Sequence, residues 1–156
     1  MPLVKKLTEY LYENKVSYEI VHHPIAYTAQ ELAASMHVPG RDFAKVVIVK
    51  ARKGYAMVVL PASCKIALDV FKDVVDDDQV RLATEDEFKG LFPDSEPGAM
   101  PPFGNVYGLP VYVDEHLTHE KEIYFQAGNH TQSMKVRYAD FARLVQPVVD
   151  KFCTHA

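Results

Sequence analysis

A lysine opens the most apolar stretch of the chain. Lys45 begins the run AKVVIVKA at 44–51, and strand alternation places it on the same face as Val47 and Val49. A lysine at a strand end commonly extends its ammonium group into water. At the rim of a cleft, the same group binds a phosphate or polarises a carbonyl, which makes Lys45 a candidate catalytic residue.

A proline-stiffened loop at residues 98–104, GAMPPFG, is the second candidate segment. Its two prolines donate no N–H, so three backbone amides are expected to be available to a carbonyl or an oxyanion: those of Gly98, Ala99 and Met100. A rigid connection without a ligand is the simpler interpretation. Glu96 precedes the loop and is a candidate for proton transfer only if it is buried.

A polar loop near the C-terminal end is the third candidate. It offers several hydrogen-bond donors in one short stretch: Gly128, Asn129, His130 and Thr131. Histidine side chains in general titrate near neutrality, so a histidine at position 130 suits either acid–base work or hydrogen-bond donation. The alternative is a polar turn with Gly128 or Asn129 in a left-handed conformation.

The histidines and cysteines predict neither a metal site nor a cofactor. His22 and His23 are adjacent and point to opposite faces of a strand, while the pair at 116 and 119 would bind zinc only on a helix. The sequence has no H-E-x-x-H motif, phosphate-binding loop or nucleophile elbow. Cys64 and Cys153 are far apart, and we expect two reduced thiols, with a catalytic Cys64 as a minor alternative.

The three candidate segments must be positioned by helices and strands, and the sequence contains the patterns of both. Capping boxes at 28–31 and 84–87 predict two helix starts, Lys53-Gly54 predicts a hairpin turn, and Pro147 should kink or shorten the last helix. The predicted helices cover residues 3–11, 28–36, 68–75, 84–91 and 139–152, and the predicted strands cover 17–22, 44–51, 55–60, 80–83, 109–113, 122–126 and 134–137. We expect an α+β fold with helices packed on a mixed, largely antiparallel sheet, as a single domain over 1–156.

Composition and charge restrict the partners. The net charge of -4 argues against a broad phosphate-binding surface, so any contact with nucleic acid must be local or assisted by a partner. No apolar run is long enough to span a membrane, and the first ten residues lack the apolar core of a signal peptide. We therefore expect a cytoplasmic protein without a membrane partner.

Taken in order, the three segments resemble the YbaK / prolyl-tRNA-synthetase-associated editing family. The resemblance rests on Lys45 in DFAKVVIVK, on the loop GAMPPFG, and on the stretches VHHPIAYTAQEL, LPVYVDE and AGNHTQSMKVRYADFARLV. It covers about residues 10–145. Each motif is weak alone, and their order and spacing together are specific.

The resemblance implies an aminoacyl-tRNA deacylase that hydrolyses the ester between a wrong amino acid and the 3′ end of tRNA. It implies no covalent intermediate. Lys45 would orient the terminal nucleotide or the ester carbonyl, the loop from Gly98 to Pro102 would place backbone amides against the aminoacyl group, and residues 128–131 would close the pocket. A synthetase or another tRNA-binding protein is the implied partner.

Two departures keep other functions open. Some family members carry a serine and an aspartate around the last loop, where this chain has Ala127 and Met134, with Asn129 and His130 nearby. The first alternative is a non-catalytic module that binds an aminoacyl-adenosine-like ligand or a protein. The second is a metal-dependent hydrolase that uses the histidines.

Overall fold

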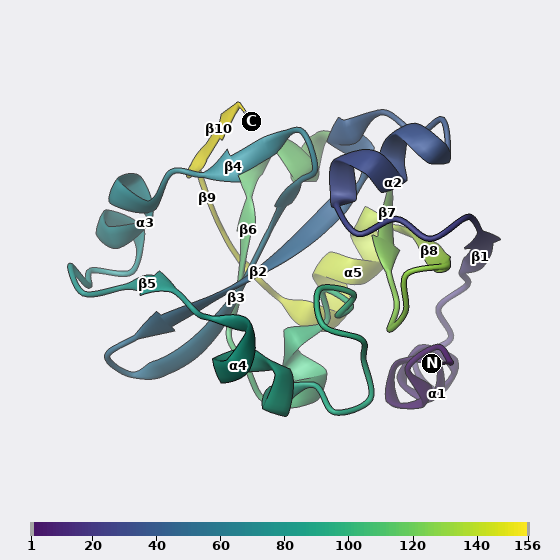
Figure 1. The fold of residues 1–156 in the computed structure, drawn as a ribbon, viewed down its shortest axis with the longest axis horizontal. Coiled ribbons are helices and arrows are strands. Elements are labelled where there is room, and N and C mark those ends of the chain that lie inside the picture. The colour runs from purple at the N-terminus through teal and green to yellow at the C-terminus, as the bar shows by residue number, and fades with distance from the viewer. Residues whose placement is uncertain (1, 156) are drawn as a thin grey trace.

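A long two-stranded ribbon runs through the centre of the computed structural model, which describes residues 2–155 (Figure 1). Strands β2 (Ala44–Ala51) and β3 (Gly54–Pro61) pair antiparallel, with Lys45 opposite Leu60. Gly54 turns the ribbon at a φ of 131°, a backbone angle that residues other than glycine rarely adopt. The hairpin predicted from Lys53-Gly54 is therefore confirmed.

Three sheets make up the β structure of residues 2–155. The ribbon belongs to a five-stranded sheet in the order β5 (Arg81–Leu82), β2, β3, β6 (Val111–Asp114) and β9 (Val148–Asp150). Its β3–β6 and β6–β9 pairs are parallel and the others antiparallel. Two antiparallel sheets complete the set: β1 (Glu19–His22), β8 (Gln132–Arg137) and β7 (Glu122–Gln126), and the pair β10 (Cys153–His155) and β4 (Cys64–Ile66). The predicted α+β class with a mixed sheet is confirmed.

Within the described part of the chain, five α-helices pack around these sheets: α1 (Lys5–Glu13), α2 (Ala29–Ser35), α3 (Leu68–Val74), α4 (Glu85–Phe88) and α5 (Tyr138–Val145). Thr28 Oγ1 accepts from the Glu31 amide at 3.1 Å, and Thr84 forms the full reciprocal capping box with Glu87. Both predicted helix starts are thus confirmed. None of the helices in residues 2–155 has the length and apolar character needed to cross a bilayer.

The central ribbon is buried on both faces because its side chains alternate between two cores. Ile48, Met57 and Val59 enter the larger core, which also receives residues of α1 and α5. Val49, Val58 and Leu60 enter a second core beside α3. This explains why 44–51 reads as a nearly continuous apolar run rather than an alternating one.

The last predicted helix is too long by seven residues. Helix α5 ends at Val145, Gln146 adopts a left-handed φ of 50°, and the chain continues through Pro147 into β9 and β10. Pro147 has no N–H and its ring clashes with the preceding helical turn, so the helix stops before it. Val148 and Val149, expected on a buried helix face, are about half exposed on the edge strand β9.

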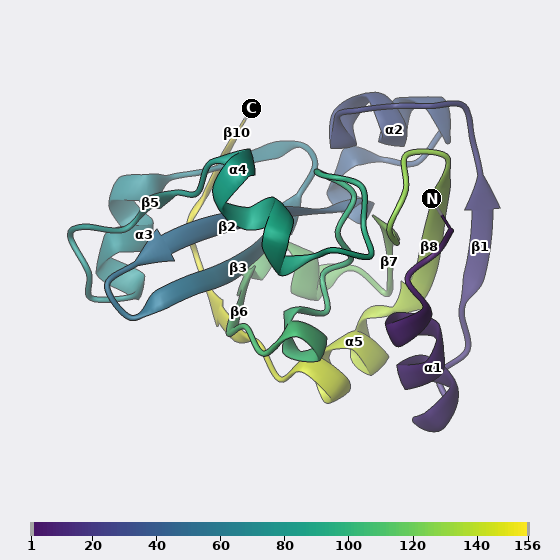
Figure 2. The same cartoon turned by 60° about the horizontal axis from the view of Figure 1, so that its bottom comes forward.

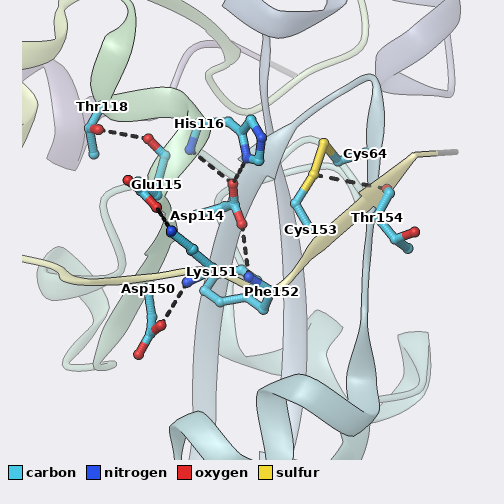
Figure 3. A network of polar contacts seen from close by, with 10 residues as sticks. All are labelled: Cys64, Asp114, Glu115, His116, Thr118, Asp150, Lys151, Phe152, Cys153 and Thr154. Carbon is cyan, nitrogen blue, oxygen red and sulfur yellow. Dashed lines mark hydrogen bonds and ion pairs between the residues drawn. A yellow bond between two sulfur atoms is a disulfide. The ribbon is translucent and has the colours of Figure 1, made fainter.

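The expectation of two separate thiols is also wrong for this structure. Cys64 of β4 and Cys153 of β10 form a disulfide that joins segments 89 residues apart (Figure 3). The sequence concealed this pairing because residues 148–152 read as the continuation of a helix, which would carry the following Cys153 away from β4.

Candidate functional site

A hollow of about 150 Å³ lies where β2 begins. It is lined by Tyr27, Ala29, Ala44, Lys45, Val46, Gly98, Met100 and Gln126. Figures 1 and 2 both show α2 and the β7–β8 loop near this end of the ribbon. The start of β2 and the proline-containing loop, some fifty residues apart in the chain, therefore share one hollow.

Lys45 is the charged group of this hollow. It is half-buried, and no carboxylate of residues 2–155 forms an ion pair with it. Burial lowers the pKa of its ammonium group, and the nearby positive charge of Lys65 on β4 lowers it further. The two lysines line a second, adjoining hollow of about 210 Å³. Two cations that face one hollow are an arrangement that binds an anion.

The proline-containing loop and the last loop are held together by backbone hydrogen bonds. The Glu96 amide donates to the Gly128 carbonyl at 2.8 Å, and the Gly128 amide donates to the Ala99 carbonyl at 2.8 Å. The Ala99 amide donates to the Glu96 carbonyl at 3.0 Å. The expectation of three available amides is thus wrong for Ala99, whose N–H closes a turn. The Gly98 amide meets only the Met100 thioether, at 3.3 Å, and a thioether is a weak acceptor.

His130 links the same two loops through its ring. Its Nδ1 lies 3.2 Å from Nε2 of Gln126, and its Nε2 lies 3.1 Å from the Pro97 carbonyl oxygen. Its backbone amide donates to Oε2 of Glu96 at 2.9 Å. An amide donor on Nδ1 and a carbonyl acceptor beside Nε2 fit the neutral ring with its proton on Nε2. Because both nitrogens have protein partners, His130 is placed to hold the loops together rather than to exchange protons with a ligand.

Asn129 shapes the last loop from inside. Its buried Oδ1 accepts from the amides of Thr131 and Gln132, at 3.0 and 2.8 Å, and from the Thr131 hydroxyl at 3.2 Å. Bonds of this kind from an asparagine to the residues just after it stabilise a turn. Asn129 therefore supports the loop and does not line the hollow.

The predicted site residues divide into three groups. Lys45, Gly98 and Met100 line the hollow itself, while His130 and Thr131 line a neighbouring one of about 430 Å³ that shares Tyr27 with it. The others are buried and support the loops from behind: Ala99, Pro102, Gly128 and Asn129.

Sequence reasoning missed two polar members of the lining, Tyr27 and Gln126. Tyr27 is 71% exposed and its ring lies tilted against the His130 ring, with the two centroids 5.1 Å apart, while Gln126 ends β7. A large aromatic residue immediately before the helix cap Thr28 was the available signal for Tyr27. Nothing in the sequence distinguished Gln126 from an ordinary strand residue.

A larger hollow of about 600 Å³ lies at the other end of the ribbon, around Gly54, Arg52 and Phe71. Arg52 forms ion pairs with Asp77 and Asp78 there, and the other basic residue of the lining, Lys53, is exposed. Because Lys45 is instead half-buried, the hollow at Lys45 is the better candidate site.

Comparisons with known proteins identify the family. Residues 23–144 match the sequence profile of the aminoacyl-tRNA editing domain. The proline–tRNA ligase of Fervidobacterium nodosum is 33% identical over 112 residues, which cover 70% of this chain and 19% of that enzyme. The chain thus spans about a fifth of the length of this curated relative.

Solved structures share the fold. The hypothetical protein APE2540 superposes with a TM-score of 0.85 and 21% identity, over 96% of this chain and 100% of that one. A proposed trans-editing enzyme for prolyl-tRNA synthetase gives 0.84 and 20%, over 96% of each chain. The resemblance stated from the sequence is confirmed, because the matched profile covers more than three quarters of the chain: this protein belongs to the aminoacyl-tRNA editing domain family.

Proposed function

We propose that this protein hydrolyses the ester that joins an amino acid to the 3′-terminal adenosine of a mischarged tRNA. The observation that carries the proposal is the position of Lys45. Lys45 lines both a small hollow with Gly98 and Met100 and an adjoining hollow with Lys65. One cation thus stands between a space for an aminoacyl group and a space for the phosphate of a terminal nucleotide.

Lys45 and the Gly98 amide supply positive charge where the reaction develops negative charge. Attack on the ester carbonyl puts an oxyanion on its oxygen, and preorganised donors in a partly dry hollow stabilise that charge far more than water does. Lys45 has no competing carboxylate among residues 2–155, and the Gly98 N–H has only a weak thioether partner. The Lys45 ammonium group and the Gly98 N–H can therefore bind a substrate oxygen at little cost in free energy.

A water molecule or a ribose hydroxyl carries out the attack. The residues that line the hollow at Lys45 include no serine, threonine, cysteine or carboxylate that would form a covalent intermediate. In the direct reaction the water oxygen bonds to the carbonyl carbon, the bond to the ribose 3′ oxygen breaks, and that oxygen takes up a proton. An aminoacyl ester is already activated, so positioning and oriented donors suffice for acceleration.

His130 acts as a positioning residue in this scheme. Its ring bridges the Pro97 carbonyl and the Gln126 amide, and Gln126 lines the hollow. The ring also lies beside Gly98, where an added Cβ would meet Cε1 at 3.8 Å. His130 therefore fixes both Gly98 and Gln126 against the substrate.

The substrate class follows from size and charge. A hollow of about 150 Å³ favours small aminoacyl groups over aromatic ones. The net charge of -4 leaves two lysines as a local anion site rather than a basic surface, so a synthetase or another tRNA-binding protein would supply the remaining contacts to the RNA. Because tRNA is charged in the cytoplasm, we assign the protein to that compartment.

The test is a panel of tRNAs charged with small and aromatic amino acids, incubated with the purified protein with and without a metal chelator. We expect faster deacylation than in buffer for at least one small amino acid, with no effect of the chelator. Loss of activity with the chelator would favour the metal-dependent hydrolase. Buffer rates across the whole panel would refute deacylation.

The alternative is a module that binds an aminoacyl-adenosine-like ligand or a protein without reaction. It is favoured by the last loop, where Ala127 and Met134 are fully buried in the core instead of offering polar groups. Protection of charged tRNA by the protein, without release of the amino acid, would support this alternative.

The coupling between the two lysines predicts a measurable pKa change in Lys65→Met. Lys65 lowers the pKa of Lys45, so its removal should move the Lys45 pKa upward, towards its ordinary value. Part of the lowering should remain, because burial is its larger cause. NMR titration of lysine labelled at Cε measures this directly. Lys53→Met, at the far turn of the ribbon, should leave the Lys45 pKa unchanged, and an unchanged pKa in Lys65→Met would contradict the proposed pairing.

A further inference from the structure

A second polar cluster lies beside the disulfide, on the side of the molecule where the chain ends (Figure 3). Strands β4 and β10 pair there, with Cys153 opposite Ile66 and His155 opposite Cys64. Cys153 lies beyond residues 23–144, which match the editing-domain profile. The cluster therefore includes a part of the chain that the family assignment does not cover.

Asp114 is the centre of this cluster. Its side chain is fully buried at the end of β6, where Oδ2 accepts from the Phe152 amide at 3.0 Å. Oδ1 accepts from the His116 backbone amide at 2.9 Å and lies 2.6 Å from Nδ1 of the His116 ring. The carboxylate thus fixes the ring of a histidine whose side chain is 65% exposed.

Three potential ligand atoms converge at this point. One atom each from Asp114, His116 and Cys153 lie within 4.8 Å of one another, and Cys64 is bonded to Cys153. We propose that, once the disulfide is reduced, this cluster binds Zn²⁺ with the thiolates of Cys64 and Cys153, the His116 imidazole and the Asp114 carboxylate. Two sulfurs, one nitrogen and one oxygen form a donor set that zinc accepts in a tetrahedral site.

The positions of Cys64 and Cys153 suit both a disulfide and a zinc site. The Cα atoms lie 5.6 Å apart, within the range of a disulfide. Two thiolates on one zinc ion stand only about 3.8 Å apart, given Zn–S bonds of about 2.3 Å. Rotation of the two side chains is enough to open that distance, so the backbone pairing of β4 and β10 can persist.

Conversion of the disulfide into the zinc site takes two electrons and releases two protons. A phosphine reductant breaks the S–S bond by giving it two electrons, and it becomes a phosphine oxide with an oxygen from water. The two protons of that water go to the sulfurs as thiols. Zinc binding then displaces both thiol protons into solvent.

The solvent access of the cluster and the charges around it support metal binding. A hollow of about 430 Å³, lined by Glu115, His116, His119, Lys151 and Cys153, opens the cluster to solvent. Lys151 forms an ion pair with Glu115 at 3.5 Å, so its positive charge is matched. In a reducing compartment a cysteine pair of this kind is present as thiols, which then serve as metal ligands more often than as a structural bridge.

Zinc would keep the C-terminal strand attached when the disulfide cannot. Phe152 is buried in the core beside α3, and its amide is bonded to Asp114. Reduction without a metal leaves β10 held by its strand pairing and Phe152 alone. The disulfide and the zinc site are therefore two alternative links that hold β10 against the rest of the molecule.

The test uses Co²⁺ as a spectroscopic probe for Zn²⁺. The full chain is reduced with a phosphine, desalted without oxygen and titrated with Co²⁺. We expect a thiolate-to-cobalt charge-transfer band and the visible bands of tetrahedral cobalt at one equivalent, both abolished by added Zn²⁺. The oxidised protein and the double variant Cys64→Ser/Cys153→Ser should show neither band.

Two histidine variants separate this site from adventitious binding to thiols. His116→Ala should lower the affinity for Co²⁺ at least about tenfold. It should still form the disulfide on oxidation, which mass spectrometry verifies and which shows that the fold is intact. His119→Ala, in the same short segment, should bind as the wild type does. Absence of the thiolate band in the reduced wild type, or equal affinity in His116→Ala, would overturn the proposal.

Discussion

Replacing Lys45 by methionine should slow deacylation by about a hundredfold, the usual cost of removing one group that stabilises an oxyanion. Lys45 is the charged residue that lines the small hollow, and it lies with Lys65 on the adjoining one. Methionine keeps the length and apolar stem of the side chain but removes its charge. Single-turnover hydrolysis at saturating protein isolates the chemical step from binding.

The same substitution should raise thermal stability near neutral pH. The pKa of Lys45 is lower in the folded protein than in the unfolded chain, so the unfolded chain binds the proton more tightly. Its charge therefore costs folding free energy at every pH below the folded pKa, and this cost falls as the pH rises from there to the ordinary lysine value. Lys45→Met removes the cost, and its stability advantage over the wild type should shrink across that alkaline interval.

Lys53→Met is the matched control, because it removes an exposed lysine at the other end of the ribbon. It should change neither the hydrolysis rate nor the melting temperature beyond the small effect of a surface substitution. Full activity in Lys45→Met would remove the basis of the proposed function. A loss of stability in Lys45→Met would instead show that the ammonium group has a partner within the fold.

The central ribbon and the helix starts could be predicted because local chemistry determines them. Lys53-Gly54 fixes a turn, and Thr84 with Glu87 satisfies the first amides of a helix. Both effects act within a few residues, so one sequence suffices. Lys45 was found for a similar reason, since a charged residue at the start of a doubly buried strand conflicts with its surroundings.

The end of the chain could not be predicted because distant contacts decide its structure. Residues 148–152 carry a plausible helical pattern, and only pairing with β6 and β4 makes strands of 148–150 and 153–155. The same pairing brings Cys153 to Cys64 and places both near Asp114. Spacing in the sequence contains none of these relations.

Both loops of the site were recognised, but two of their polar groups form hydrogen bonds within the protein. Asn129 and the Ala99 amide have the chemistry of ligand-binding groups, yet the fold uses both within the loops. Hydrogen-bonding capacity is visible in a sequence, whereas the partner that takes it up is not. The pair Tyr27 and Gln126 was missed because burial and packing, rather than residue type, place them on the hollow.

The loop contacts predict that Gly128→Ala should cost about 2–4 kcal/mol of folding free energy and most of the activity. Gly128 has a φ of 121°, which strains any other residue, and an added Cβ would lie 2.9 Å from Cγ2 of Val4 and 3.2 Å from its backbone nitrogen. Val4 cannot retreat easily, because its amide donates to the Ala127 carbonyl at 3.0 Å. Denaturation in urea measures the cost, and deacylation of the best substrate measures the effect on the site.

Gly54→Ala separates backbone strain from the loss of loop contacts. Gly54 has a similar φ of 131°, but an added Cβ there meets no atom within 4 Å. It should therefore lose only about 1–2 kcal/mol, the cost of the strained backbone, and keep its activity. Gly128 differs because it also bonds to Glu96 and Ala99, so a shift at this residue displaces the loop that carries Gly98. Equal losses of stability in the two variants, or full activity in Gly128→Ala, would show that the proline-containing loop does not depend on its connection to residue 128.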